Sequence, residues 1–568
     1  MKEYLDKILD NKYGFWICFI LILLLGLGLR LTLIDFPLWY DEGCSIAAAI
    51  KSFPLGINDY LWNHDLQHTP LYFYILHFIM QFFGDSVVVM RVSSLIVSMA
   101  LLPVTYIVTE KLSSKKVAFL AMLLMSVNTF QVLYSIEIRM YPYVILLSLL
   151  SINYLIDYDR NSDRKSLIKL GIVNLLNPYF LTGSIVFVLA QFIIYSSYLD
   201  LKKADSKKIS DYVISNLIVF LGFIPYIILI AHYAIVRSHF LVTDISKFTS
   251  TNFTGMLQNL FACDPGHIHE TRFEPFKVDD IKTWLLVFVP VAGMFAGLYS
   301  FTKDKERMNH VIFWIITLCF CVFVFLAHSR IIAFTGRYLI FITPFIFILT
   351  AIGFSKFNKY VVLLSVLFYS AMCIWGLQTT YNYYRDIAEF SLKSPADFCR
   401  NHYPGKQNLV IMPFASSVSF YYFKGDDMPR VVPLELLHEV RNPDSKIVYD
   451  ENQTEAFKKY DKYSIFQNII IGDKFISKNL TNFLDDYIHT VPKGGYIIWV
   501  VYYSDNYAIQ RPEVVKNFYS NYDNVKNMAS TGMLSKFDLD LVAILSQRAD
   551  FVGKDRDASN QFFVFRRK

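Results

Sequence analysis

Two adjacent carboxylates, Asp41 and Glu42, follow the aromatic pair Trp39 and Tyr40, a few residues beyond the first long apolar run of the chain. Aromatic residues in this position are typical of a membrane interface, where they form a belt beside solvated acids. A carboxylate held at the depth of a lipid headgroup could instead take a proton from a hydroxyl group as a general base. The sequence therefore makes Asp41 and Glu42 candidate catalytic residues and leaves the interfacial belt as the alternative.

A second pair of ionisable residues, Glu137 and Arg139, stands just before Tyr141 and between two apolar runs. Ionisable side chains so close to an apolar region need a partner or a function. Glu137 is therefore a candidate catalytic residue, and Arg139 and Tyr141 are candidate substrate-binding residues. A local ion pair is the alternative. Arg91, just inside another apolar run, needs a partner for the same reason and joins the binding candidates.

Three further positions could contact a phosphate group. His68, in a His-Thr-Pro sequence, could donate a hydrogen bond to a phosphate, or it could belong to the polar start of a helix. Another apolar run begins near Arg330 and Arg337, and Tyr338 directly follows Arg337. An arginine side chain suits bidentate contact with phosphate. The alternative for these arginines is that they reach toward the membrane interface from the end of a helix.

Two clusters of polar residues could bind a divalent metal, which prefers ligands of these types. The candidate ligands are His64, Asp65, Asp264, His267 and His269. For the first two, capping of the short helix that follows is the favoured alternative. The others lie in a loop at 236–282, which is of a length that often covers a site. We therefore name no required cofactor and keep a divalent metal as an open alternative.

These residues must be positioned by helices that cross a membrane. The chain is 54% apolar and 17% aromatic but only 18% charged, and its apolar residues gather in long runs. A soluble protein would expose such runs as large apolar patches, whereas a bilayer accommodates them. About eleven runs approach the roughly twenty residues needed for a span. They lie at 14–34, 87–108, 117–134, 143–156, 167–181, 185–198, 213–235, 284–299, 311–327, 338–354 and 361–377.

The positions of Lys and Arg predict the orientation of these spans. With the N-terminus in the cytoplasm, every inner loop is basic, as the positive-inside rule requires. The inner basic residues include Lys111, Arg160, Lys202, Lys303 and Lys356. The apolar stretch 70–83 is too short to span and is interpreted as a re-entrant or interfacial helix. Residues 35–86 and the chain after about 380 then face outward, and we expect a prokaryotic cytoplasmic membrane.

The last part of the chain has ordinary soluble composition. Strand-like runs occur at 408–413, 496–502, 539–544 and 561–565, with mixed helical or loop stretches such as 394–401 between them. We expect residues 380–568 to form an extracytoplasmic α/β domain. Residues 1–379 are expected to form a multi-pass helical catalytic domain, with the candidate acid in its outer loop at 35–86.

Taken together, these segments resemble the membrane-embedded GT-C glycosyltransferases. They are most similar to glycosyltransferase family 39, the dolichyl-phosphate-mannose–protein mannosyltransferase group, and more distantly to the lipid A aminoarabinose transferases. The resemblance covers about 14–354. The segments that carry it are Trp39-Tyr40-Asp41-Glu42, His68-Thr69-Pro70-Leu71-Tyr72, Arg91, Glu137-x-Arg139-Met140-Tyr141, Arg337-Tyr338-Leu339 and Pro344.

The resemblance implies roles for several of these residues. Asp41 would be the catalytic acid/base, and Glu137 would be a second acid that helps to hold the donor or the acceptor. His68 and Arg337 would lie near a lipid phosphate. The chain departs from many relatives at Asn177-Pro178-Tyr179, where those relatives carry a Thr-His-Tyr-like element.

The expected function is transfer of a monosaccharide from a polyprenyl-phosphate donor to an acceptor hydroxyl, with inversion. The acceptor could be a protein, a lipid or a cell-envelope glycan. The sequence contains no Gly-rich phosphate loop, so nucleotide hydrolysis is not indicated, and no nucleic-acid partner is expected. The alternative is a transporter or lipid flippase, which would use the same charges for translocation but is typically recognised by inverted repeats and broken helices.

Overall fold

The computed structural model of this protein describes residues 11–64, 68–199, 206–228, 231, 288, 291–296, 307–329, 336–389, 393–412, 417–433, 487–502, 545, 547–556 and 560–568. The chain divides into two compact units. The first, called the helical unit below, comprises Met1–Asp35, Ala49–Val236 and Asp244–Tyr383. The second, called the mixed unit, comprises Phe36–Ala48, Arg237–Thr243 and Tyr384–Lys568.

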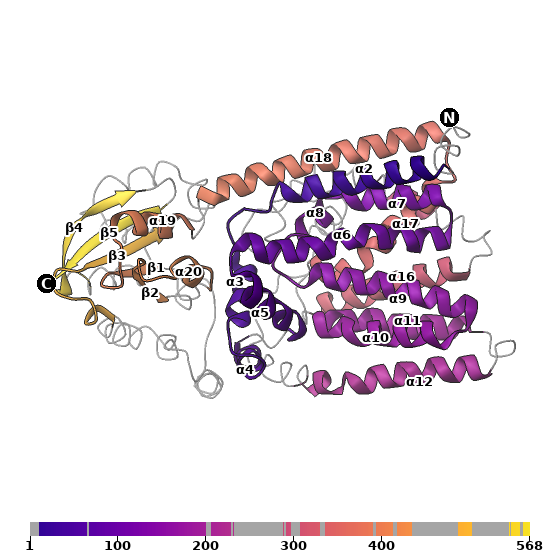
Figure 1. The fold of residues 1–568 in the computed structure, drawn as a ribbon, viewed down its shortest axis with the longest axis horizontal. Helices are drawn as coiled ribbons and strands as arrows, with labels where there is room; N and C mark the ends of the chain where they lie inside the picture. Colours follow the sequence, from indigo (N-terminus) through magenta and orange to yellow (C-terminus); the bar gives the residue numbers. More distant parts are fainter. Residues whose placement is uncertain are drawn as a thin grey trace. The chain divides into compact units, whose positions relative to one another are not determined.

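The helical unit consists of helices that lie side by side (Figure 1). They are α2 (Lys12–Leu31), α4 (Leu55–His64), α5 (Leu71–Phe83), α6 (Val87–Leu112), α7 (Lys115–Val127), α8 (Thr129–Tyr134), α9 (Tyr141–Asn161), α10 (Arg164–Phe180), η1 (Thr182–Ser184), α11 (Ile185–Tyr198), α12 (Ser206–Gly222), α16 (Arg307–His328), η3 (Gly336–Ile342), α17 (Thr343–Phe354) and most of α18 (Lys359–Glu389). Helix α9 packs between α6 and α10, α11 packs on α16, and α7 packs on α17. The stretch 70–83, expected to be a short helix, contains α5.

Within the described part of the chain, five helical segments are long and apolar enough to cross a membrane by length and composition. They are Lys12–Leu31, Val87–Leu112, Met308–His328, Gly336–Phe354 and Lys359–Gln378. Each coincides with a run predicted as a span, and this protein is therefore an integral membrane protein with a helical core. The predicted runs at 143–156, 167–181 and 185–198 correspond to α9, α10 and α11. The runs at 213–235 and 284–299 lie partly outside the described residues.

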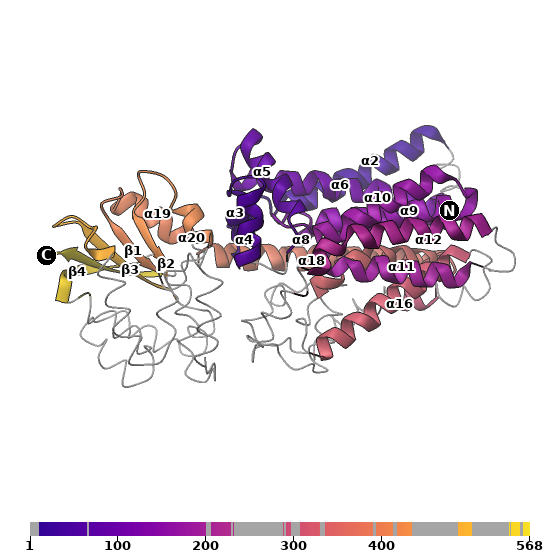
Figure 2. The same ribbon diagram turned by 90° about the horizontal axis from the view of Figure 1, so that it is seen from below.

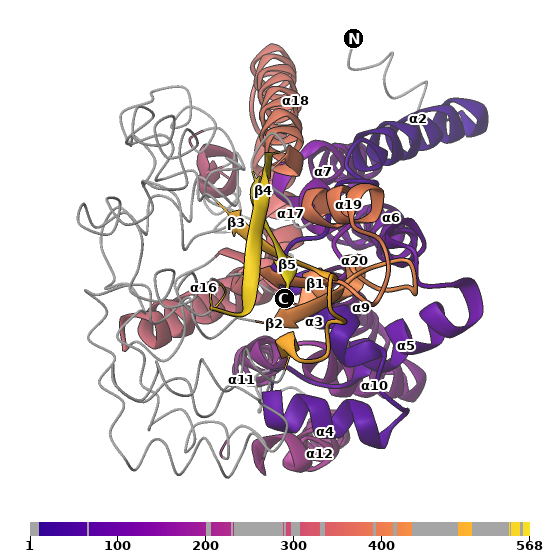
Figure 3. The ribbon, with the colours of Figure 1, turned by 90° about the vertical axis from the view of Figure 1, so that its left-hand side faces the viewer.

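The spans differ in how much of their surface other helices cover. In the span Gly336–Phe354, 89% of the most apolar stretch is buried by the rest of the protein. In the span Lys12–Leu31, only 11% of the corresponding stretch is buried. Figure 3 shows α2 and α18 at the edge of the helical unit. Because lipid is as apolar as a protein core, exposed apolar side chains on α2 and α18 are suited to face the bilayer. Helix α17 is instead the central element around which the others pack.

The predicted span 117–134 is wrong as a single helix, because the structure breaks it into α7 and α8 at Asn128. The Asn128 backbone is extended, and its side-chain oxygen accepts a hydrogen bond from the Gln131 amide at 2.9 Å, which caps α8. Its side-chain nitrogen donates to the Tyr369 hydroxyl at 2.9 Å, and Gln131 donates to Thr343 Oγ1 at 2.6 Å. Helix α8 is thereby fixed to α17 and α18, and it leads directly into the Glu137–Arg139 segment.

In its described residues, the mixed unit contains a five-stranded sheet of order β2-β1-β3-β5-β4, whose strands are labelled in Figure 1 and seen from below in Figure 2. Its elements are α3 (Tyr40–Ala49), α19 (Lys393–His402), β1 (Leu409–Met412), α20 (Ser417–Tyr422), β2 (Arg430–Pro433), β3 (Tyr496–Tyr502), β4 (Ala549–Arg556) and β5 (Asn560–Arg567). Strand β1 is parallel to β2 and β3, whereas β5 is antiparallel to β3 and β4.

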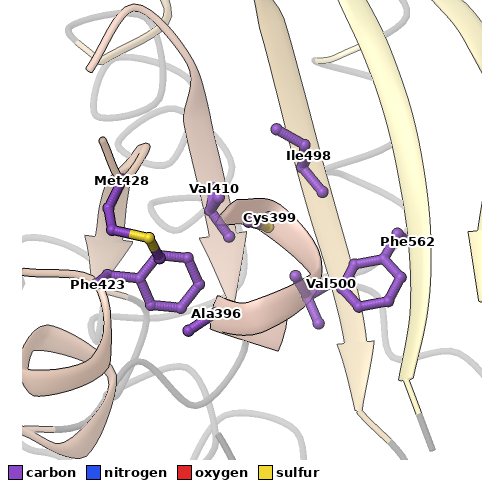
Figure 4. Close-up of a cluster of buried hydrophobic side chains, with 8 residues drawn as sticks. All are labelled: Ala396, Cys399, Val410, Phe423, Met428, Ile498, Val500 and Phe562. Atoms are coloured by element: carbon purple, nitrogen blue, oxygen red, sulfur yellow. The ribbon is translucent and has the colours of Figure 1, made fainter. Parts of the chain in front are cut away.

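The sheet and α19 share an apolar core, shown in Figure 4. Its buried members are Ala396, Cys399, Val410, Phe423, Met428, Ile498, Val500 and Phe562. The rings of Phe398 and Phe562 stack with centroids 3.8 Å apart, which fixes α19 on the sheet. The runs predicted as strands at 408–413 and 496–502 contain β1 and β3, and the predicted run at 561–565 lies within β5. The run at 539–544 lies outside the described residues.

Candidate functional site

The two adjacent acids at the start of α3 have different environments. Glu42 is fully buried, and its Oε2 accepts a hydrogen bond from the Trp39 amide at 3.3 Å. The Gly43 amide donates to the Trp39 carbonyl at 3.1 Å, so Trp39 occupies the capping position and Glu42 closes the first turn from within. Asp41 is only half-buried. The structure thus gives Glu42 a role in helix capping and leaves Asp41 as the acid with partial access to solvent.

His68 and Arg139, which are far apart in the sequence, meet in the helical unit. A guanidinium nitrogen of Arg139 lies 2.7 Å from Nε2 of His68. Because a guanidinium can only donate hydrogen bonds, Nε2 of His68 is the acceptor and the ring proton lies on Nδ1. The ring of His68 also meets Phe73 of α5 edge-on, with centroids 6.2 Å apart. The predicted phosphate-binding residues His68 and Arg139 are therefore brought together, and His68 holds the guanidinium in place.

The segment that carries Glu137 and Arg139 is buried although it is a loop between α8 and α9. Glu137 is 4% exposed and Arg139 is 3% exposed. The Arg139 amide donates to the Glu137 carbonyl at 2.7 Å, and the guanidinium lies 5.9 Å from the centre of the Tyr141 ring. Burying ionisable groups is costly unless partners or ligands compensate. We refer to His68, Glu137, Arg139 and Tyr141 as the charged cluster.

Arg337 and Tyr338 lie in η3. Both side chains are half-buried, and the Arg337 guanidinium lies 5.7 Å from the centre of the Tyr338 ring. The η3 segment packs against α9, which begins two residues after Arg139. Through the bond between Gln131 and Thr343 described above, the end of η3 is also fixed to α8. The two arginine-bearing segments are therefore held on adjoining elements.

Two other arginines of the helical unit bond to main-chain carbonyls. Arg91, 4% exposed, donates to the Ile34 carbonyl at 3.2 Å and so ties the start of α6 to the turn after α2. Arg30 is 1% exposed, and one of its nitrogens donates to the carbonyls of Gly26 at 2.9 Å and Ser126 at 3.1 Å. Arg30 is not among the residues predicted from the sequence, although an arginine inside an apolar run was the available signal.

The predicted metal ligands cannot be assessed as a group from the described residues. Asp65, Asp264, His267 and His269 lie outside the described residues, as do Arg330 and the side chain of His64. Among the residues that are described, no group of three or more His, Cys, Asp or Glu side chains could hold a metal ion.

Comparison with known proteins identifies the fold. No family model matches the sequence, and no curated protein matches it. The structure is similar to the crystal structure of ArnT from Cupriavidus metallidurans bound to undecaprenyl phosphate, with a TM-score of 0.57 and 10% identity over 98% of each chain. The chain therefore shares the fold of this ArnT. ArnT in the apo state matches this chain with a TM-score of 0.56 and 9% identity, over 97% of this chain and 98% of ArnT.

The solved structure of an archaeal oligosaccharyltransferase also matches this chain. It is AglB from Archaeoglobus fulgidus in complex with an inhibitory peptide and a dolichol-phosphate. The two chains have a TM-score of 0.45 and 12% identity, and the match covers 86% of this chain and 69% of AglB. The match to ArnT covers 98% of this chain, so the likeness in fold includes both the helical and the mixed unit.

Proposed function

We propose that this protein is a membrane glycosyltransferase that moves a monosaccharide from a polyprenyl-phosphate donor to an acceptor hydroxyl on the outer face of the membrane. The observation that carries the proposal is the buried Arg139 guanidinium held by His68. A buried guanidinium is suited to a phosphate, with which it can form two parallel hydrogen bonds. The fold likeness to an ArnT bound to undecaprenyl phosphate supports a lipid carrier for that phosphate.

The placement of basic residues supports the outer location of the charged cluster. Lys111, at the end of α6, forms an ion pair with Asp157 of α9, and Arg160 donates to the Lys111 carbonyl. Lys208 of α12 donates to the Asp159 carbonyl at 2.8 Å. Basic residues therefore gather at the C-terminal end of α9, whereas the charged cluster lies at its N-terminal end. A helix of 21 residues is about 30 Å long, which matches the hydrocarbon thickness.

The proposed reaction is a single displacement. Asp41 takes the proton of the acceptor hydroxyl, and the hydroxyl oxygen forms a bond to the anomeric carbon of the sugar. The bond between that carbon and the phosphate oxygen breaks, and its electron pair leaves with the polyprenyl phosphate. Arg139 and Arg337 stabilise the charge of the leaving phosphate, a contribution that grows as the bond breaks.

The capping role of Glu42 supports inversion at the anomeric carbon. A retaining reaction needs a second carboxylate as nucleophile, about 5–5.5 Å from the first. Glu42 is the acid nearest to Asp41 in sequence, but its carboxylate is buried and its Oε2 faces the Trp39 amide. We therefore assign Asp41 alone to proton transfer, while Glu137 helps to hold the donor or the acceptor.

A transporter or lipid flippase is the rival function, because the break between α7 and α8 is a broken helix of the kind that transporters use. Here, however, both polar atoms of the Asn128 side chain bond to protein groups, the Gln131 amide and the Tyr369 hydroxyl. The break thus serves to fix α8. Release of free polyprenyl phosphate by purified protein without an ion gradient would exclude a transporter as the sole function.

The proposal is tested by replacing Asp41 with asparagine in purified protein in liposomes. Loss of a general base lowers the rate about 10²–10⁴-fold, so the Asp41→Asn variant should be nearly inactive with a synthetic polyprenyl-phosphate sugar. Asp35→Asn is the matched control, because this nearby acid is exposed and has no assigned role. Near-normal transfer by the Asp41→Asn variant would refute the assignment. Mass spectrometry of glycans and lipids from a deletion strain would identify the acceptor.

A further inference from the structure

The segment that carries Asp41 belongs to the mixed unit, although it lies in the N-terminal part of the sequence. The amide of Leu38 donates a hydrogen bond to the Tyr422 hydroxyl of α20 at 2.8 Å. The two residues are 384 positions apart in the chain. Leu38 is 5% exposed, so its amide has little access to water. The entry to α3 is therefore fixed by a side chain from the C-terminal part of the protein.

A second contact lies on the other side of Asp41. A Cβ atom at Gly43 would clash with the side chain of Val418 and would lie 2.8 Å from its backbone nitrogen. Val418 is 1% exposed. Backbone atoms cannot move away as the tip of a side chain can, so only glycine allows α3 to lie this close to α20. Gly43 is thus a close-approach position two residues after the proposed base.

Together with the Glu42 cap, these contacts fix the backbone before and after Asp41. Leu38 is held by Tyr422, Trp39 by Glu42, and Gly43 by Val418. A general base must stay within hydrogen-bond reach of its proton, and a displacement of about 1 Å can cost about 100-fold in rate.

We propose that α20 is the element that positions the catalytic base, with Tyr422 and Val418 as positioning residues that act through α3. This inference rests on the proposed function, in which Asp41 is the base. It gives the C-terminal sheet unit a direct part in the chemistry, beyond recognition of an acceptor. Removing the Tyr422 hydroxyl should lower the turnover of bound substrate, because it shifts the base and leaves the residues of the charged cluster unchanged.

The kinetic test compares Tyr422→Phe and Gly43→Ala with matched controls. We expect kcat to fall about 10-fold for Tyr422→Phe and up to about 100-fold for Gly43→Ala, with KM for the lipid donor unchanged. Tyr360→Phe is the control for loss of a hydroxyl, because this ring is 58% exposed. Gly28→Ala is the control for an added methyl group, because nothing lies within 4 Å of that position. A rise in KM with unchanged kcat would overturn the inference.

Cys44, which is half-buried in α3 next to Gly43, provides a readout that does not depend on activity. Cys44, Cys263 and Cys399 are the cysteines in segments expected to face outward, so Cys263 is replaced by serine. In this background, the rate at which Cys44 reacts with a membrane-impermeant maleimide should rise in the Tyr422→Phe and Gly43→Ala variants. Cys399 is fully buried and should not contribute. If kcat and Cys44 reactivity both stay at wild-type values in Tyr422→Phe, the positioning role is refuted. If Asp41→Asn remains active, the proposed function itself fails.

Discussion

The helical unit contains two buried polar clusters that differ in charge. The neutral cluster consists of Ser151, Asn174 and Gln191, from α9, α10 and α11, each at most 1% exposed. Ser151 donates to Asn174 at 2.6 Å, Asn174 donates to Gln191 at 2.6 Å, and Gln191 donates to Ser151 at 2.7 Å. The bonds form a closed ring of uncharged groups. Such a ring fixes the packing of three helices and needs no further component.

In the charged cluster, Glu137 and Arg139 are nearly as deeply buried, but they are a carboxylate and a guanidinium. Desolvation of an ion costs far more than desolvation of an amide, and a purely structural contact could be made by neutral groups. Ionisable residues inside membrane proteins are therefore expected to serve function. The comparison teaches that burial alone does not distinguish a structural network from a site, whereas the charge of its members does.

The largest expected effect is loss of activity when the charged cluster is broken at Arg139. Arg139→Ala should lower sugar transfer about 10²–10³-fold, as expected for loss of one group that stabilises transition-state charge. Arg139→Lys should restore little of it, because an ammonium lacks the planar pair of donors. The measurement is the initial rate of polyprenyl-phosphate release, normalised to folded protein. Full activity in Arg139→Lys would remove the reason to assign Arg139 to the phosphate.

Breaking the neutral cluster should lower the stability of the protein and leave its activity unchanged. Gln191→Leu leaves Ser151 and Asn174 each without one bond of the ring and should lower the free energy of unfolding by about 1–3 kcal/mol. Activity per folded molecule should stay unchanged. Thermal unfolding in detergent, followed by an assay of the folded fraction, measures both. A specific loss of activity in this variant would show that the neutral cluster also belongs to the site.

The Asn128 cap of α8 shares a feature with each cluster. Its groups are neutral, as in the neutral cluster, but α8 leads into the segment that carries Glu137 and Arg139. Asn128→Ala removes the helix cap and the bond to Tyr369 and should cost about 0.5–2 kcal/mol of stability. Because α8 precedes Glu137, a modest fall in activity should accompany it. Tyr369→Phe separates the two effects, because it keeps the cap and removes only the hydroxyl partner. Equal losses in both variants would argue against a separate contribution of the cap.

The smallest effect is expected at the opposite end of α9. The Lys111 ammonium lies 2.5 Å from the Asp157 carboxylate, with both side chains more than a quarter exposed. Exposed pairs of this kind contribute about 0.2–1 kcal/mol, and salt weakens them. Lys111→Met should therefore change the melting temperature only slightly at low salt and not at all at high salt. Strong destabilisation would mean that this charged pair is as important as the buried clusters.

The sequence predicted those parts of the fold that leave a local signal. Long apolar runs located the spans, and the continuous run at 496–502 predicted β3. The break at Asn128 was missed because its partner Tyr369 is 241 positions away. Strand β4 was missed because it is a polar edge strand with a register shift near Gly553.

The candidate site, too, could be predicted from the sequence only in part. The ionisable residues beside apolar runs were found because such residues are rare there, and the structure brings His68 to Arg139. The separate environments of Asp41 and Glu42 were not predictable, because they depend on which side chain reaches back to the Trp39 amide. The contact of α3 with α20 joins distant segments and leaves no signal in one sequence, apart from the glycine at position 43.

The most direct test of the account is the affinity of the purified protein for polyprenyl phosphate itself. Binding should be measured in detergent for the wild type, Arg139→Ala and Gln191→Leu, each at the same concentration of folded protein. Arg139→Ala should bind the lipid phosphate at least about tenfold more weakly than the wild type does. This corresponds to a loss of about 1.4 kcal/mol in binding free energy. Gln191→Leu should bind it as the wild type does. Equal affinity in all three proteins would contradict the assignment of the charged cluster to the lipid phosphate.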